Sequence, residues 1–238
     1  MTSFSKDWLT VAVLVVAFFG YFERTQPFYR QFKLSDSRLQ HLFAHEERVT
    51  DLQLYFLCTV IPMGIVAGVY TAKRKLALLL KSVHATMVGL WISLTVAAVF
   101  TDILKDWIGN PRPDFLERCG AKPGTASDVY VDVAVCNAPL GLNRLADGMK
   151  LTPSGHSSMI FALMFYLYLW LGEHGAILRV NRWIWQFLRV GPLLLGCYVA
   201  FSRTQDYRHH FFDVCLGLSI GIAVGWLLYK KYHAEIEV

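Results

Sequence analysis

Three short polar clusters carry residue types that suit the transfer of a phosphoryl group. In the first cluster, Lys105 and Arg112 stand seven positions apart beside two prolines. The lysine offers a compact positive charge, and the arginine offers a planar fork of N–H donors that matches phosphate oxygens. A solvated basic loop would also explain this cluster. The cluster therefore indicates a phosphate site only in combination with the other two clusters.

The second cluster reads Thr-Pro-Ser-Gly-His-Ser-Ser from Thr152 to Ser158. We expect Thr152 to cap a helix, because a hydroxyl there accepts a hydrogen bond from a free N–H group and proline suits the first turn. The other N–H groups of a helix start attract anions. Ser154 would add a hydroxyl, Gly155 would allow close approach, and His156 could exchange a proton with a bound group. The alternative is an ordinary capped helix with a polar histidine.

The third cluster runs from Ser202 to Asp213 and adds a nucleophile. His209 and Asp213 are four positions apart, which predicts that they share one face of a helix. A carboxylate bonded to one imidazole nitrogen fixes the tautomer and leaves the other nitrogen free to attack phosphorus. Arg203 supplies a third cation. The alternative is a surface ion pair at a helix start.

None of these clusters contains a set of carboxylates that could hold magnesium. Three cations from the protein would take the place of a metal in neutralising the phosphoryl group. His41 and His45 are four apart and could form half of a metal site, but no third ligand follows at a diagnostic spacing. We therefore expect a solvated helix face there, and neither a metal nor another cofactor.

The elements that must position these clusters are membrane helices. Charged residues make up 17% of the chain, compared with about 25% in soluble domains. Several stretches hold no Asp, Glu, Lys or Arg, and about 20 apolar residues in a helix cross a membrane. We predict an all-α integral membrane bundle of six transmembrane helices that forms one domain over residues 1–238. The expected spans are Trp8–Phe22, Leu52–Ala72, Ser82–Thr101, Ser157–Gly172, Trp183–Phe201 and Phe211–Tyr229.

Six spans bring all three clusters to one side of the membrane, together with the long loops at residues 23–51 and 102–153. Lys and Arg are denser at the N-terminus, Lys73–Lys81, Glu173–Arg182 and the C-terminal tail, although the cluster side holds the larger raw number. The positive-inside rule then makes the cluster side non-cytoplasmic. The net charge of +5 does not indicate nucleic acid, because the charges flank apolar spans and form no single basic face.

Cys119 and Cys136 are the only cysteines in a polar segment. A non-cytoplasmic loop lies in an oxidising compartment, which favours a disulfide between them. Two free thiols are the alternative. Between these cysteines, the alternation over Val129–Val135 is typical of a strand.

In the sixth span, Gly217, Gly221 and Gly225 recur at four-residue spacing and so share one helix face. Small residues on one face let another helix approach closely. We favour a helix of the same chain as the partner over a helix from a second copy.

Taken together, the clusters resemble the signatures of the type 2 phosphatidic acid phosphatase family, also called lipid phosphate phosphatases. These signatures are a lysine, six residues, then Arg-Pro; Pro-Ser-Gly-His; and Ser-Arg, five residues, His, three residues, Asp. The chain contains all three without a gap or substitution. The resemblance implies six membrane helices and a metal-independent phosphatase, with His209 as nucleophile and His156 as proton donor. The residues that it implies for binding phosphate are Lys105, Arg112, Ser154, Gly155 and Arg203.

The first loop narrows the resemblance, because Pro27–Asp36 and Phe43–Thr50 are similar to fungal-type diacylglycerol pyrophosphate phosphatases. The expected function is hydrolysis of phosphatidic acid, lysophosphatidic acid or diacylglycerol pyrophosphate through a phosphohistidine. The expected partners are this lipid phosphate and membrane lipids, and no nucleic acid. A polyisoprenyl or sphingoid phosphate phosphatase is the alternative enzyme. A catalytically silent scaffold is less favoured, because His156, His209 and Asp213 are intact. The organelle stays open among vacuole, endoplasmic reticulum, Golgi and plasma membrane, as does the oligomeric state.

Overall fold

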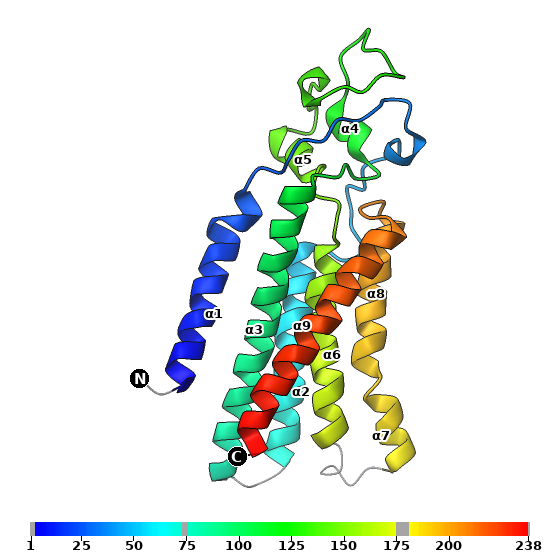
Figure 1. The fold of residues 1–238 in the computed structure, drawn as a ribbon. Helices are drawn as coiled ribbons and strands as arrows, with labels where there is room; N and C mark the ends of the chain where they lie inside the picture. The colour runs from blue at the N-terminus through cyan, green and yellow to red at the C-terminus, as the bar shows by residue number, and fades with distance from the viewer. Residues whose placement is uncertain (1–2, 73–75, 175–180, 238) are drawn as a thin grey trace.

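A computed structural model describes residues 3–72, 76–174 and 181–237, and its helices form an elongated bundle with folded loops at one end (Figure 1). Within these ranges no strand is present, and six segments are long and apolar enough to cross a membrane. The all-α fold with six membrane helices is therefore confirmed. The long helices are α1 (Ser3–Gly20), α2 (Asp51–Ala72), α3 (Leu76–Ile108), α6 (Gly155–His174), α8 (Gly191–Gln205) and α9 (Phe211–Glu237).

The fifth apolar segment is not one unbroken helix, as the span Trp183–Phe201 had suggested. Helix α7 (Arg182–Leu188) ends before α8 begins at Gly191. Pro192 explains the break, because proline has no N–H group for the helical ladder and its ring clashes with the preceding turn. Figure 1 shows α7 bent away from the axis of α8.

Helix α6 occupies the centre of the bundle and packs against α3, α8 and α9. A Cβ atom at Gly217, Gly221 or Gly225 of α9 would collide with backbone atoms of α6 or of Ser154, the residue before it. The small face of the sixth span therefore packs within the chain, as expected. This close approach brings the start of α9 against the start of α6, where the second and third clusters lie.

The two long loops fold together over one end of the bundle. They contain the short helices α4 (Phe115–Cys119) and α5 (Leu142–Asp147) and the 3-10 turns Phe22–Arg24, Ser37–Leu39 and Val133–Val135. The strand expected over Val129–Val135 is wrong, because Asp132 caps the last of these turns by accepting from the Ala134 amide. Only an isolated bridge between Phe32 and Val131 connects the loops in a strand-like way within the described ranges.

Cys119 and Cys136 are joined by a disulfide, with their Cα atoms 4.6 Å apart. The disulfide ties α4 to the segment after the Val133–Val135 turn, and Cys119 is fully buried. The predicted bond is therefore confirmed in the structure.

Replacing Cys119 and Cys136 together with serine is expected to lower the free energy of unfolding by about 3 kcal/mol. The bond closes a loop of 17 positions, and the chain-entropy model assigns about that value to such a loop. Thermal unfolding in detergent would measure the change, with Cys215→Ser as the control because Cys215 is a free thiol. Alkylation of both Cys119 and Cys136 in untreated wild-type protein would contradict the prediction.

The described termini lie toward the end of the bundle opposite the loops (Figure 1). This agrees with the expected parity of six spans. The expected orientation rests partly on the density of Lys and Arg in the short connections between spans. Four of these residues lie outside the described part of the chain: Lys73, Arg74, Lys75 and Arg179.

Candidate active site

A cavity of about 370 Å³ opens beneath the loops and collects residues from all three clusters. Lys105 reaches it from the last turn of α3, which extends beyond the expected end at Thr101. Arg112 follows α3, and Arg203 lies near the end of α8. These residues are far apart in the sequence but close in the structure, because α3 and α8 end, and α6 begins, at the same end of the bundle. The three expected cations therefore surround one space, which Arg144 and Lys150 also line.

Both histidines line the same cavity and are almost fully buried, with His156 9% and His209 4% exposed. Arg203 is 2% exposed, and its Nε atom has no hydrogen-bond partner among the described residues. The Nδ1 atom of His209 is also without one. Buried polar atoms are normally paired, so these two indicate room for a ligand that carries hydrogen-bonding oxygens.

Gly155 leaves room for the Lys105 ammonium group in its observed position. A Cβ atom at Gly155 would lie 2.7 Å from the Lys105 ammonium nitrogen, which is closer than such atoms can pack. That ammonium group is bonded to Asp102 at 3.2 Å and lines the cavity. The structure therefore brings these two expected phosphate-binding residues together, one from each of two clusters.

The start of α6 differs from the expected cap. Helix α6 begins at Gly155, so Ser154 is the capping residue, and its hydroxyl oxygen lies 3.4 Å from the Ser157 amide nitrogen that donates to it. The Ser154 amide donates to the main-chain oxygen of Asp213 at 3.1 Å and is not free for phosphate. Thr152, the expected cap, lies too early in the chain and instead donates its hydroxyl hydrogen to the Asp213 carboxylate at 2.6 Å.

Asp213 does not bond to His209 in the structure, contrary to the argument from helix spacing. Helix α9 starts at Phe211, so His209 precedes it and the two side chains do not share a helical face. The Asp213 carboxylate accepts from Thr152 and from the His210 amide, the latter at 3.0 Å. It thereby ties the peptide next to His209 to the segment before α6.

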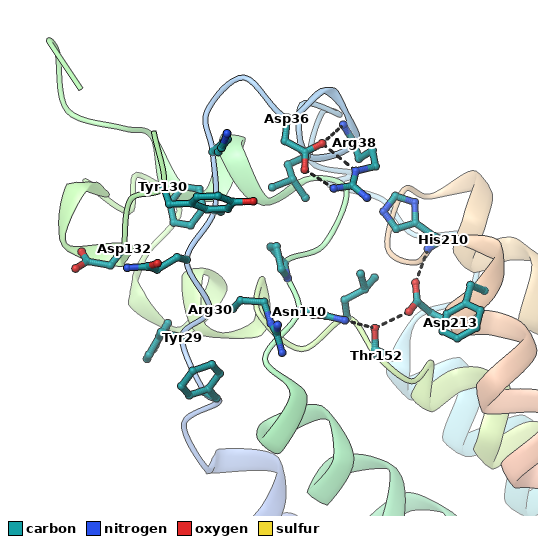
Figure 2. A pocket seen from close by; sticks show the side chains of 18 residues that line it. Tyr29, Arg30, Asp36, Arg38, Asn110, Tyr130, Asp132, Thr152, His210 and Asp213 are labelled. Carbon is teal, nitrogen blue, oxygen red and sulfur yellow. Dashed lines mark hydrogen bonds and ion pairs between the residues drawn. The ribbon is translucent and has the colours of Figure 1, made fainter. Parts of the chain in front are cut away.

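Asp213 also faces a different space, a cavity of about 970 Å³ between the two loops (Figure 2). Asn110 donates to the Thr152 hydroxyl at 3.1 Å, and Thr152 donates to Asp213. This short chain of hydrogen bonds lines the larger cavity, whereas His156 and His209 line only the smaller one. The two candidate histidines therefore share the smaller cavity, and Asp213 lies outside its lining.

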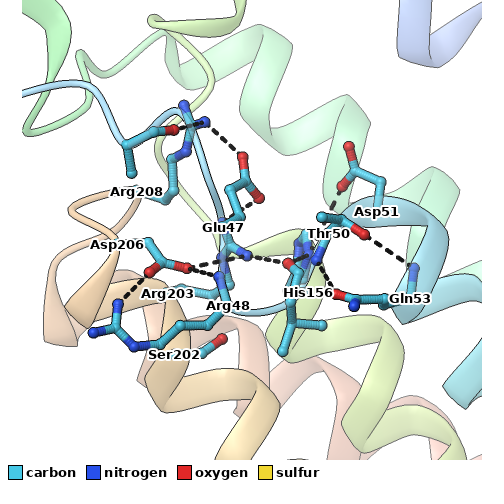
Figure 3. Close-up of polar contacts among 12 residues, drawn as sticks. Glu47, Arg48, Thr50, Asp51, Gln53, His156, Ser202, Arg203, Asp206 and Arg208 are labelled. Carbon is cyan, nitrogen blue, oxygen red and sulfur yellow. Dashed lines mark hydrogen bonds and ion pairs between the residues drawn. The ribbon is translucent and has the colours of Figure 1, made fainter.

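His156 is held by the first loop (Figure 3). Its Nε2 atom lies 3.1 Å from the Val49 carbonyl oxygen. A carbonyl oxygen only accepts, so Nε2 carries a hydrogen and Nδ1 is the basic atom of the neutral ring. Arg203 donates to the same carbonyl oxygen at 2.6 Å. One peptide group of the first loop therefore orients two side chains of the cavity.

Comparison with known proteins finds similarity along most of the chain. Residues 84–237 match the PAP2 superfamily, which covers more than half of the chain.

The chain belongs to the PAP2 superfamily.

Diacylglycerol pyrophosphate phosphatase 1 of Saccharomyces cerevisiae is 35% identical over 97% of this chain and 79% of its own length. A probable diacylglycerol pyrophosphate phosphatase 1 of Schizosaccharomyces pombe is 31% identical over 98% of this chain and 82% of its own length. Lipid phosphate phosphatase 1 of Arabidopsis thaliana is 28% identical over 95% of this chain. No solved structure matches the chain.

The first-loop contribution to the site of this PAP2 protein was missed from the sequence. Glu47 and Val49 line or support the cavity, although they lie outside residues 84–237. Arg208, beside the expected nucleophile, is 2% exposed and paired with Glu47. The similarity of Phe43–Thr50 to fungal-type relatives was the signal that could have pointed to this segment.

Among the described residues, no three His, Cys, Asp or Glu side chains gather closely enough to hold a metal ion. His41 stacks on the Tyr207 ring with 4.2 Å between ring centroids, and His45 lies edge-on to Phe43. The helix face expected at these two histidines is wrong, because residues 40–50 are not helical, and both side chains take part in aromatic contacts instead.

We expect His209 of this PAP2 protein to stay neutral in mildly acidic buffer. Burial, followed by the positive charges of Arg112, Lys105 and Arg203, holds the pKa of His209 well below its ordinary value. Diethyl pyrocarbonate modifies neutral imidazole, and a free histidine with a pKa of about 6.5 keeps roughly one tenth of its reactivity at pH 5.5. Tandem mass spectrometry of the modified, substrate-free protein should show His209 reactivity near its plateau at pH 6. A half-point at or above pH 6.5 would contradict this expectation.

Proposed function

We propose that this PAP2 protein is a lipid phosphate phosphatase that works through a phosphohistidine at His209. The single observation that carries the proposal is the cavity in which His156 and His209 lie together with the expected phosphate-binding cations Lys105, Arg112 and Arg203. A phosphoryl group needs positive neutralisation, a nucleophile and a proton donor, and this cavity supplies all three. The names of the relatives support a lipid phosphate as the substrate.

In the proposed reaction, Lys105, Arg112 and Arg203 hold the phosphate oxygens. His209 attacks phosphorus, so an N–P bond forms while the P–O bond to the lipid breaks. His156, protonated on Nδ1 at this stage, gives that proton to the departing oxygen, and the dephosphorylated lipid leaves. His156 then takes a proton from water, whose oxygen attacks phosphorus and breaks the N–P bond. Acid–base help of this kind contributes about 10²–10⁴-fold to the rate.

Asp213 has a supporting role in this proposal. Its bonds to Thr152 and to the His210 amide hold the chain on both sides of the site. It would therefore orient His209 through the neighbouring peptide, and not by accepting a hydrogen bond from the imidazole. Ser154 would act through its capping hydroxyl at the start of α6.

An apolar cavity next to the charged one supports a substrate with a hydrocarbon tail. It has a volume of about 250 Å³ and lies among α1, α2, α3 and α6. Phe18, Tyr55, Ala98 and Met159 line both cavities, so the two lie side by side. Phosphatidic acid, lysophosphatidic acid and diacylglycerol pyrophosphate fit this combination, and a polyisoprenyl or sphingoid phosphate remains the second candidate because it has the same two parts.

We also propose that the whole chain works as one domain with its active site on the non-cytoplasmic face. The parity of the six spans and the positive-inside rule support this orientation. The disulfide between Cys119 and Cys136 supports it too, because such bonds persist in oxidising compartments.

The purified protein in detergent is expected to release phosphate from lipid phosphates in the presence of EDTA. Its three cations supply the charge that a metal would otherwise supply, and vanadate should inhibit because it adopts the geometry of phosphorus under attack. The measurement is phosphate release from a panel of phosphatidic, lysophosphatidic, pyrophosphate, polyisoprenyl and sphingoid substrates. Activity that EDTA abolishes and only magnesium restores would overturn the metal-independent mechanism, and no release from any member would overturn the function.

A further inference from the structure

An unbroken series of ion pairs connects Arg112 with Arg203, two of the arginines that line the smaller cavity. Positive and negative side chains alternate along it, and the nitrogen–oxygen separations run from 2.6 to 3.2 Å. In order, its members are Arg112, Asp147, Arg118, Asp114, Arg208, Glu47 and Arg203. Each internal member bonds to two neighbours, so the position of one arginine is coupled to that of the other.

Glu47 is the link that closes this series at Arg203 (Figure 3). Its Oε2 atom accepts from Arg203 at 2.7 Å, and its Oε1 atom is 2.6 Å from the Arg208 guanidinium. Burial by itself raises the pKa of the Glu47 carboxyl, but Arg203 and Arg208 outweigh burial and hold that pKa below its ordinary value. The carboxylate is therefore charged at neutral pH while it lines the phosphate cavity.

The two first-loop acceptors determine which edge of Arg203 is free. The Val49 carbonyl oxygen takes a hydrogen from Nη1, and Glu47 takes one from Nη2. The Nε atom is buried and has no partner among the described residues. A guanidinium presents its N–H groups in a fixed fork, so holding two of them orients the third.

We propose that Glu47 is a positioning residue for phosphoryl transfer that acts through Arg203. This inference rests on the proposed phosphatase function and adds to it a residue outside the part of the chain that matches the superfamily. The carboxylate has two opposite effects on a bound anion: it repels the anion, and it aligns the guanidinium. Repulsion acts on any phosphate-like anion, whereas alignment matters most for the five-coordinate geometry of the transition state.

The test compares Glu47→Gln with Glu46→Gln in the full chain, purified in detergent. Glu46 is the neighbouring residue and is exposed, so its variant makes the same charge change outside the cavity. Hydrolysis of dioctanoyl phosphatidic acid gives kcat and KM. Competitive inhibition by vanadate measures binding of a transition-state shape, and inhibition by inorganic phosphate measures binding of a ground-state shape.

We expect Glu47→Gln to lower kcat by about 10- to 100-fold, the range for loss of one charge-assisted hydrogen bond. Vanadate inhibition should weaken by a similar factor, while phosphate inhibition changes less than threefold. Glu46→Gln should match the wild type. An unchanged kcat with tighter binding of both anions would show that Glu47 only repels the substrate and would overturn the proposal.

Two further variants separate positioning from folding. Glu47→Asp keeps the charge and shortens the side chain. We expect it to weaken inhibition by vanadate more than inhibition by phosphate, and this result can be measured even if Glu47→Gln does not fold. In an Arg203→Ala background, Glu47→Gln should weaken vanadate binding far less than it does alone, because the residue through which it acts is missing. If the losses of vanadate binding in Arg203→Ala and Glu47→Gln were additive in the double variant, the inference would be overturned. An inactive wild type would overturn the proposed function instead.

Discussion

Replacing His209 with alanine is expected to remove both turnover and the covalent phosphoenzyme. The imidazole is the group in the cavity whose Nδ1 lacks a hydrogen-bond partner among the described residues, and burial among cations keeps it neutral. Loss of a nucleophile typically costs at least about 10⁴-fold in rate. Phosphate release from labelled lipid phosphate measures the loss, with His45→Ala as a control because His45 is exposed and lines neither cavity.

His156→Ala is expected to give a different result. A substrate with a good leaving group needs little protonation, so attack by His209 proceeds, whereas hydrolysis of the intermediate still needs an activated water. Overall turnover should fall by about 10²–10⁴-fold while labelled phosphohistidine accumulates. The intermediate is acid-labile and base-stable, so an alkaline quench followed by peptide mapping would locate it.

The position of the label decides between the two roles. We expect it on His209 in the His156→Ala protein and nowhere in the His209→Ala protein. Label on His156 would show that the roles are reversed. Label that persists in His209→Ala would show that another residue is the nucleophile and that the proposed mechanism is wrong.

Replacing Gly221 with leucine is expected to separate α9 from α6 and to inactivate the protein. A Cβ atom at Gly221 would collide with the Ser158 carbonyl oxygen and approach the Ala162 amide nitrogen to 2.9 Å, and both atoms belong to the backbone of α6. Backbone cannot rotate away as a flexible side chain can, so the helices must move apart. Overpacking of this kind typically costs about 1–3 kcal/mol and occasionally more.

The catalytic effect of Gly221→Leu should exceed its effect on stability. The α6–α9 contact holds Asp213 against Thr152 and Ser154, and these bonds position the peptide beside His209. A displacement of about 1 Å can reduce a rate about 10²-fold. We therefore expect a loss of that size in kcat together with a lower thermal midpoint.

Gly68→Leu is the matched control for this prediction. Gly68 lies within α2 and is exposed, and no atom lies within 4 Å of the Cβ position. The same substitution there adds the same side chain to a membrane helix without touching a neighbour. If Gly221→Leu kept the activity and thermal midpoint of Gly68→Leu, the close packing of α6 and α9 would not be needed for the site.

Several features of the protein follow from local sequence. A run of apolar residues long enough to cross a membrane specifies a helix by itself, because its backbone groups must bond to one another in lipid. The parity of six such runs then brings Lys105, Arg112, His156, Arg203 and His209 to one end of the bundle, where they line one cavity. The glycine spacing on α9 and the cysteine pair likewise led to contacts that the structure contains.

Other features required the tertiary structure, because they depend on where an element begins or on contacts between distant segments. His209 and Asp213 are four residues apart, but α9 starts between them, so helical spacing did not apply. Ser154 caps α6 because the helix begins at Gly155, while the Thr152 hydroxyl bonds to Asp213, 61 positions further along the chain. Glu47 reaches Arg203 across 156 positions. A carboxylate in a loop carries no local sign of the buried arginine that it will meet, and only the packing of the first loop over α8 decides that pairing.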